Sequence, residues 1–219
     1  EGAKEAYARL NKHSIHTIST SYTCNEATLH YNTIFSKPIE GMLKDIATVR
    51  SNKKLRYPIF VSNSRKINMD DIGEGVSFIG GFRMTGATIK GYGDDKGLST
   101  VYIKNNKGQT ILKGQSTNFD ILKGEKVVSS EARITLYIHN EDGSLDSIFH
   151  PNIQFVYNIV NRKVDLTRGN SNTSRVPFTN SLQEMDLTVF SLSWFIDSDE
   201  LNLGDNNHEL EMASKNYFN

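Results

Sequence analysis

The 219-residue sequence predicts an all-β protein, either an antiparallel sandwich or an elongated stack of β layers, with a short helix at each end. Two observations carry this prediction. Apolar side chains recur at every second position in several stretches, which is the period of an extended strand. Clusters of Asn, Asp and Gly separate these stretches at intervals of about ten residues, as in antiparallel hairpins. Because no helical pattern alternates with the strands, a parallel α/β fold is disfavoured.

The clearest alternation lies at residues 133–138 and 186–196, where aliphatic or aromatic side chains alternate with polar ones. In the second stretch Trp194 has apolar neighbours two residues away on both sides, which favours a core position for its ring. Hairpin turns are expected at 105–108 and 141–143, because Asn and Gly tolerate the positive φ angles of tight turns. Further strands are expected at 76–80, 84–90, 98–104 and 109–117.

Both ends of the chain contain helix-forming residues. Residues 1–10 place Ala3, Ala6 and Leu10 at helical spacing. Residues 207–215 have a similar composition and begin with an asparagine that can cap a helix. These patterns predict one short helix at each end.

The sequence is interpreted as one β-rich domain over residues 1–219, or as a segment of a longer protein, and it allows an internal boundary near 51–72. The chain begins with Glu1 and has no signal peptide, which favours a segment cut from a longer or processed chain. No apolar run approaches the roughly 18 residues that a membrane-spanning helix needs. We therefore expect no transmembrane segment in this chain.

The charge balance and the cysteine count exclude several classes of protein. Lys and Arg number 25, as do Asp and Glu, whereas a nucleic-acid-binding domain normally carries a basic excess. We therefore predict no nucleic-acid partner. Cys24 is the single cysteine, so the chain has neither a disulfide framework nor a multi-cysteine zinc site.

No motif assigns a catalytic, cofactor-binding or metal-binding residue, and no cofactor is expected. The six histidines lack metal-ligand spacing. The acidic residues at 197–200 lack the remainder of a calcium loop, and Glu184 and Asp186 share a strand face without a second acidic wall. The glycines within 80–93 do not form a phosphate-binding loop and are more typical of bulges or close sheet approach.

Several short motifs follow one another in a distinctive order. They occupy residues 58–61, 73–87, 145–151, 176–181, 193–194 and 216–218. This series resembles a β-rich region of very large uncharacterised exported proteins of Bacteroidota, over most of the chain from about residue 57 onward. The resemblance implies membership in a longer chain that is exported to the periplasm or associated with the outer membrane. It assigns no activity, but it singles out six motif residues without a role: Gly80, Gly81, Phe82, His150, Pro151 and Trp194.

These observations favour a non-enzymatic structural or binding module of a bacterial cell-envelope protein, which holds a lipid or a protein partner between its sheets. Other domains of the same or a partner protein are the expected partners, and lipid and glycan remain open as ligands. The alternative is a carbohydrate-binding β-sandwich module, which requires two or three exposed aromatic rings on one sheet face. A second alternative is a glycoside hydrolase with two facing carboxylates about 5–10 Å apart.

Overall fold

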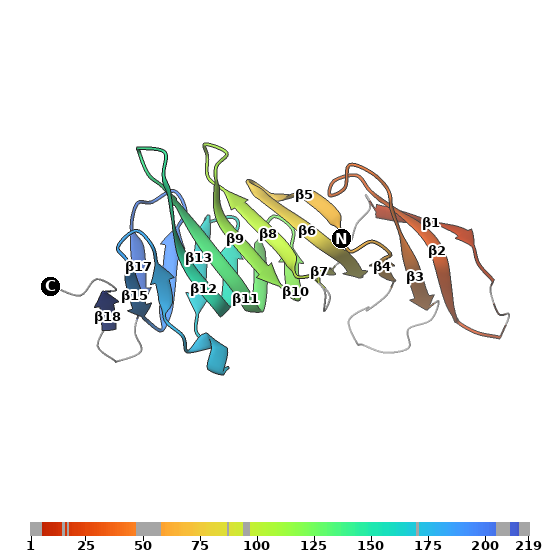
Figure 1. The fold of residues 1–219 in the computed structure, drawn as a ribbon. Coiled ribbons are helices and arrows are strands. Elements are labelled where there is room, and N and C mark those ends of the chain that lie inside the picture. Colours follow the sequence, from red (N-terminus) through yellow and green to blue (C-terminus); the bar gives the residue numbers. More distant parts are fainter. Residues whose placement is uncertain are drawn as a thin grey trace.

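The computed structural model describes residues 6–14, 16, 18–46, 58–86, 88–93, 97–169, 171–204 and 211–214. Eighteen strands in these residues join into one sheet, in which every pairing is antiparallel (Figure 1). The helical content of this part of the chain is one turn of 3₁₀ helix, η1 (Asn172–Ser174). The prediction of an all-β fold is confirmed. No helix among the described residues has both the length and the apolar character needed to cross a membrane.

The strands run across the long axis of the molecule and succeed one another along it, from β1–β3 at one end to β15, β17 and β18 at the other (Figure 1). Their bounds are β1 (Ala6–Lys12), β2 (Ser21–Tyr31), β3 (Ile39–Ile46), β4 (Ile59–Ser62), β5 (Ile67–Gly73), β6 (Val76–Thr85), β7 (Thr88–Tyr92), β8 (Ser99–Lys104), β9 (Thr110–Ser116), β10 (Asn118–Leu122), β11 (Lys126–His139), β12 (Leu145–Asn158), β13 (Lys163–Thr167), β14 (Phe178–Asn180), β15 (Met185–Thr188), β16 (Ser191–Phe195), β17 (Leu201–Gly204) and β18 (Glu211–Ser214).

The short helices predicted at the two ends are wrong where the structure describes them. The first region contains β1, which pairs with β2, and the second contains β18, which pairs with β15. In β1 the exposed Tyr7 and Arg9 alternate with the partly buried Ala8 and Leu10, so the same residues also fit a period of two. Pairing with a neighbouring strand therefore outweighs the helix propensity of alanine. Residues 1–5, 207–210 and 215 of the predicted helices lie outside the described residues.

Two predicted strands are each divided by a turn. The stretch 84–90 contains the end of β6 and the start of β7, separated at Gly86, whose φ is +56°. The stretch 186–196 contains β15 and β16. The hairpin turns predicted at 105–108 and 141–143 are confirmed, and their glycines have φ angles of +77° and +85°. Strand β4 and most of β5 lie within the segment 51–72, and β4 pairs with β3, which precedes that segment.

Three strands, β6, β11 and β12, take part in two rows of the sheet. The first half of β6 pairs with β5 and β8, whereas its second half pairs with β4 and β7. The change falls at Gly80 and Gly81. In the same way β11 pairs first with β10 and then with β9, and β12 pairs first with β14 and then with β13.

These changes of partner divide the sheet into two arms. Arm A consists of β5, the first half of β6, β8, β9, the second half of β11, the first half of β12, β14, β15 and β18. Arm B consists of β1–β4, the second half of β6, β7, β10, the first half of β11, the second half of β12, β13, β16 and β17.

Aromatic rings fill the space between the arms at the centre of the molecule. Phe78 of arm A packs edge-on against Phe119 of arm B, and Phe119 packs in the same way against Phe155, with both pairs of ring centroids 6.2 Å apart. All three side chains are fully buried. A Cβ atom at Gly91 would collide with the ring of Phe78, so this glycine permits the close approach of the two arms. The interior is therefore a packed core at this level.

Hydrogen bonds also join the two arms at the strand ends that lie farthest from the bends. The backbone N–H of Gly124 in arm B donates to the carbonyl of Ile72 in arm A at 2.8 Å. The guanidinium of Arg162, in the turn between β12 and β13, donates to the carbonyl of Lys104 at 3.5 Å. The body is thus a sandwich, with shared bent strands at one margin and contacts from the turns of arm B to the strand ends of arm A at the other.

Buried polar side chains gather where the strands bend. Ser62 Oγ accepts a hydrogen bond from the backbone N–H of Phe82 at 2.9 Å, just after the glycine pair in β6. Ser129 donates to Ser116 at 2.9 Å, and Ser116 donates to the carbonyl of Glu131 at 2.6 Å. The sheet ladder is irregular at these bends, and a buried backbone group without a partner is costly. The serine hydroxyls supply the missing partners.

Replacement of Gly80 tests the close packing at the bend of β6. A Cβ atom there would lie 2.5 Å from Cζ of Phe78 and 2.6 Å from Cβ of Ser99. We expect Gly80→Ala to lower the free energy of unfolding by about 2 kcal/mol, because the fully buried Phe78 ring cannot move aside. Urea denaturation measures this change. The control Gln154→Ala, at an exposed position of β12, should change stability by less than about 0.5 kcal/mol. Equal stability of the Gly80→Ala variant and the unaltered protein would contradict the packing.

Candidate functional site

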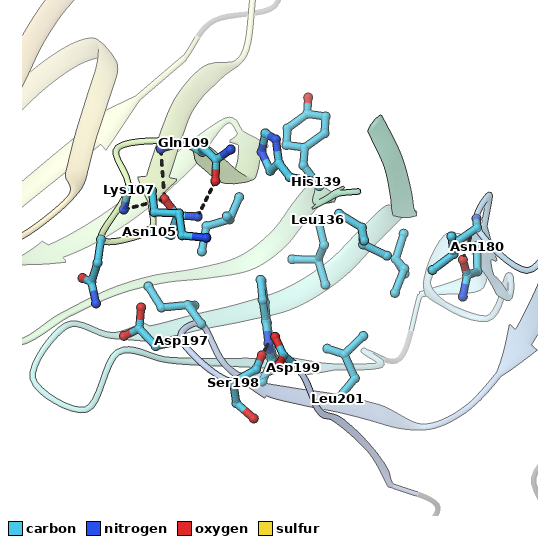
Figure 2. A pocket seen from close by; sticks show the side chains of 18 of the residues that line it. Asn105, Lys107, Gln109, Leu136, His139, Asn180, Asp197, Ser198, Asp199 and Leu201 are labelled. Atoms are coloured by element: carbon cyan, nitrogen blue, oxygen red, sulfur yellow. Dashed lines mark hydrogen bonds between the residues drawn. The ribbon is translucent and has the colours of Figure 1, made fainter. Parts of the chain in front are cut away.

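A cleft of about 730 Å³ lies between arm A and arm B near their C-terminal strands (Figure 2). Arm A contributes side chains from β9, β11, β12 and the end of β14, and from the turns after β8 and β14. Arm B contributes β16, the turn that follows it and the start of β17. In Figure 2, Leu136 and His139 lie on one side of the hollow, and Asp197, Asp199 and Leu201 lie on the other.

The floor of the cleft is apolar. Buried and half-buried apolar side chains from both arms form this floor, so it closes the gap between arm A and arm B. One of them, Ile111, is the extra residue of a bulge, because Ile103 pairs with Leu112 and Lys104 pairs with Thr110. The buried floor residues are Ile111, Leu136, Ile148 and Ile196, and the half-buried ones are Ile138, Trp194 and Leu201.

Carboxamide side chains form much of the rim. Asn105 Oδ1 accepts hydrogen bonds from the backbone N–H groups of Lys107 and Gln109 at 3.0 Å each, and its Nδ2 donates to Gln109 Oε1 at 2.9 Å. Across the cleft floor, Asn180 likewise caps its own turn and donates from Nδ2 to Gln183 Oε1. These bonds fix both rim turns, as is usual for asparagine in turns.

Trp194 is the single tryptophan of the chain and lines the cleft from β16. Its indole N–H donates to the carbonyl of Ser198 at 2.7 Å, which holds the ring against the turn between β16 and β17. The side chain packs on the core together with Leu192, as the sequence predicts, but it remains only partly buried. It therefore contributes both to the core and to the wall of the cleft.

The charges around the cleft nearly balance. Asp197 is paired with Arg162, whose Nε lies 2.6 Å from Oδ2 of the carboxylate. This hydrogen bond lowers the pKa of Asp197 and raises the pKa of Arg162. Lys107 and Asp199 also line the cleft, together with His139, whose Nε2 is 2.9 Å from the carbonyl of Thr110. Among the residues that the structure describes, the lining therefore has no cluster of cations.

Tyr157 is fully buried, and it is close enough to this ion pair for both charges to affect its pKa. No partner among the described residues forms a hydrogen bond with its hydroxyl. Burial raises the pKa of Tyr157 to about 12, and the charge of Asp197 acts in the same direction, whereas that of Arg162 opposes it. An unpartnered buried hydroxyl of this kind is a cost to the fold.

The six motif residues of the sequence analysis do not form one site. Gly80, Gly81 and Phe82 lie at the bend of β6, and His150 and Pro151 lie at the bend of β12. Trp194 alone lines the cleft. The sequence marks the turn at 105–108 and the acidic residues at 197–200, but no local pattern shows that they share a cleft with Trp194. Five of the six motif residues thus lie at bends of the sandwich, and one lies in the cleft.

His150 has a clear part in the bend of β12. Its Nδ1 accepts a hydrogen bond from the backbone N–H of Asn152 at 3.2 Å, and its Nε2 lies 3.1 Å from the carbonyl of Val176. These contacts require a neutral imidazole that carries its proton on Nε2. The ring also packs on Phe178, with centroids 4.6 Å apart. The residue therefore supports the backbone where β12 passes from arm A to arm B.

The described residues give little support to the two alternative functions, a carbohydrate-binding module and a glycoside hydrolase. The strongly exposed aromatic side chains, Tyr7 and Phe195, lie on β1 and β16, near opposite ends of the molecule (Figure 1). The cleft carboxylates Asp197 and Asp199 come from one turn and do not face each other from two walls. No group of three or more His, Cys, Asp or Glu side chains in the described part could hold a metal ion.

Comparison with known proteins gives no relative: no family model, no curated protein and no solved structure matches this chain.

We expect His150→Leu to lower the free energy of unfolding by about 2 kcal/mol, because leucine leaves the N–H of Asn152 and the carbonyl of Val176 without their imidazole partner. Chemical denaturation measures the loss. Gln154→Leu, which places the same side chain at an exposed site on β12, serves as the control and should have little effect. If both variants are as stable as the unaltered protein, the imidazole does not support the bend.

Tyr157→Phe removes the unpartnered hydroxyl, so at pH 7 stability should stay unchanged or rise by up to about 1 kcal/mol. The pKa of Tyr157 is raised from 10.0 to about 12, so the folded state holds the phenolic proton more tightly than the unfolded state. The protonated Tyr157 therefore contributes to the free energy of unfolding, and this contribution is complete below pH 10 and is lost as the pH rises through 12. Urea denaturation at alkaline pH should therefore show a steeper loss for the unaltered protein than for Tyr157→Phe. If the two proteins lose stability equally as the pH rises, the pKa of Tyr157 is not raised in the folded state.

Proposed function

We propose that this chain is a non-enzymatic scaffold and binding module of a bacterial cell-envelope protein, and that the cleft between arm A and arm B holds part of its partner. The observation that carries the proposal is the cleft itself, with an apolar floor and a carboxamide rim between two sheet arms. Its volume falls in the range of typical binding pockets. The envelope setting and export are supported by the motif resemblance alone.

The chemistry of the cleft supports binding more than catalysis. Asp197, which could act as an acid or base, is engaged by Arg162. Asp199 comes from the same turn, so the two carboxylates cannot stand on opposite sides of a scissile bond. His139 is directed to the carbonyl of Thr110. Each of these groups is compatible with recognition of a ligand and lacks the partner that a reaction would need.

The packed core supports a scaffold in preference to a protein that transports lipid along its length. A protein that passes a lipid along its length needs a continuous apolar groove, whereas here the rings of Phe78, Phe119 and Phe155 close the interior. A partner therefore binds within the cleft and does not travel through the module. The shared strands β6, β11 and β12 keep the two walls of the cleft in a fixed relation.

The fluorescence of Trp194 tests the proposal directly, because no other tryptophan contributes to the signal. We expect the neutral apolar probe N-phenyl-1-naphthylamine to quench Trp194 emission saturably by energy transfer. Leu201→Asp, which places a charge in the cleft, should weaken this binding about ten-fold.

Asn202→Asp is the matched control, because it places the same carboxylate on the exposed opposite face of β17. It should bind the probe as the unaltered protein does. If the probe leaves Trp194 emission unchanged, or if the two variants bind it equally, the cleft is not the binding site.

A further inference from the structure

We propose that the partner is an extended polypeptide segment that adds to the edge of β17 as a further strand and places every second side chain in the cleft. This inference rests on the proposed function, because it names the chemical class of the partner that the cleft holds.

The edge of β17 supplies the first part of the argument. Among the strands that the structure describes, β17 pairs with β16 alone, from Ser191 opposite Gly204 to Trp194 opposite Leu201. Every second residue of an edge strand directs its N–H and C=O away from its neighbour, and such an edge is a template for another strand. Strand addition of this kind is a common mode of peptide recognition.

The side chains of β17 supply the second part. Leu201 and Leu203 are only half-buried on the core side of the strand, and Leu201 lines the cleft. Asn202, between them, is exposed on the other side. A strand added here would place alternate side chains beside Leu201 at the usual cross-strand distance of about 5 Å. Apolar residues at those positions would cover the half-buried leucines.

The composition of the lining favours a polypeptide over a lipid. An acyl chain can contact the apolar floor, but it offers no hydrogen-bonding groups to the carboxamides of the rim or to the edge of β17. In the described part of the lining, Lys107 and Asp199 nearly balance and Asp197 is paired to Arg162, so these residues form no cation cluster for an anionic headgroup. An extended polypeptide brings both apolar side chains for the floor and backbone amides for the carboxamide rim. We therefore expect a partner strand without net charge.

The test uses the complete 219-residue chain and a synthetic peptide of about eight residues that alternates valine or isoleucine with threonine or serine. We expect the peptide to shift Trp194 emission saturably and to slow hydrogen exchange at least ten-fold for those backbone amides of Leu201–Gly204 that face away from β16. A peptide of the same composition with its apolar residues in one block should bind at least ten-fold more weakly. Leu201→Asp should weaken binding, and Asn202→Asp should retain it.

Three results would overturn the inference. The first is equal binding of the alternating and the blocked peptide. The second is a shift in Trp194 emission without protection of the β17 amides. The third is saturable quenching of Trp194 by a dibrominated fatty acid together with no response to the peptide, which would assign the cleft to a lipid. In the last case, or if only N-phenyl-1-naphthylamine binds, the proposed function stands and the strand addition fails.

Discussion

The architecture depends on one constraint: a strand that passes from one row of a sheet to another must bend, and its buried backbone groups must still find hydrogen-bond partners. Ser62, Ser116, Ser129 and His150 meet this requirement with polar side chains that are themselves buried. The bends bring the arms face to face. The aromatic core and the cleft between the arms both follow from that arrangement.

The interior divides into two regions with different chemistry. Around Phe78 and Gly91 the arms approach so closely that only a residue without a side chain fits opposite the ring. Farther toward the C-terminus the space between the arms is lined by turns, and asparagines fix these turns by bonding their own backbone. The module thus combines a closed, rigid centre with an open hollow beside an edge strand. This combination suits a domain that holds a partner in place.

Sequence alone predicts the parts of this fold that depend on local repetition. The alternation at 133–138 identifies a strand correctly because each second residue has the same environment. The helix predicted at 1–10 fails because pairing with β2 decides the conformation of Ala6–Lys12. The cleft is not predictable locally, since Gln109, Asn180 and Trp194 lie far apart in the sequence and meet only through the pairing of the long strands. The glycines at the β6 bend suggest close approach, but only the structure identifies Phe78 as the neighbour.

The shared strands also set the cooperativity of the molecule. Strands β6, β11 and β12 each contribute backbone bonds to both arms, so the backbone of the two arms is continuous through these three strands. Local unfolding commonly proceeds in contiguous units, and we expect the shared strands and the Phe78–Phe119 contact to join both arms in one such unit at the centre of the molecule. Within a longer polypeptide under tension, this central part would resist or yield as a single mechanical element.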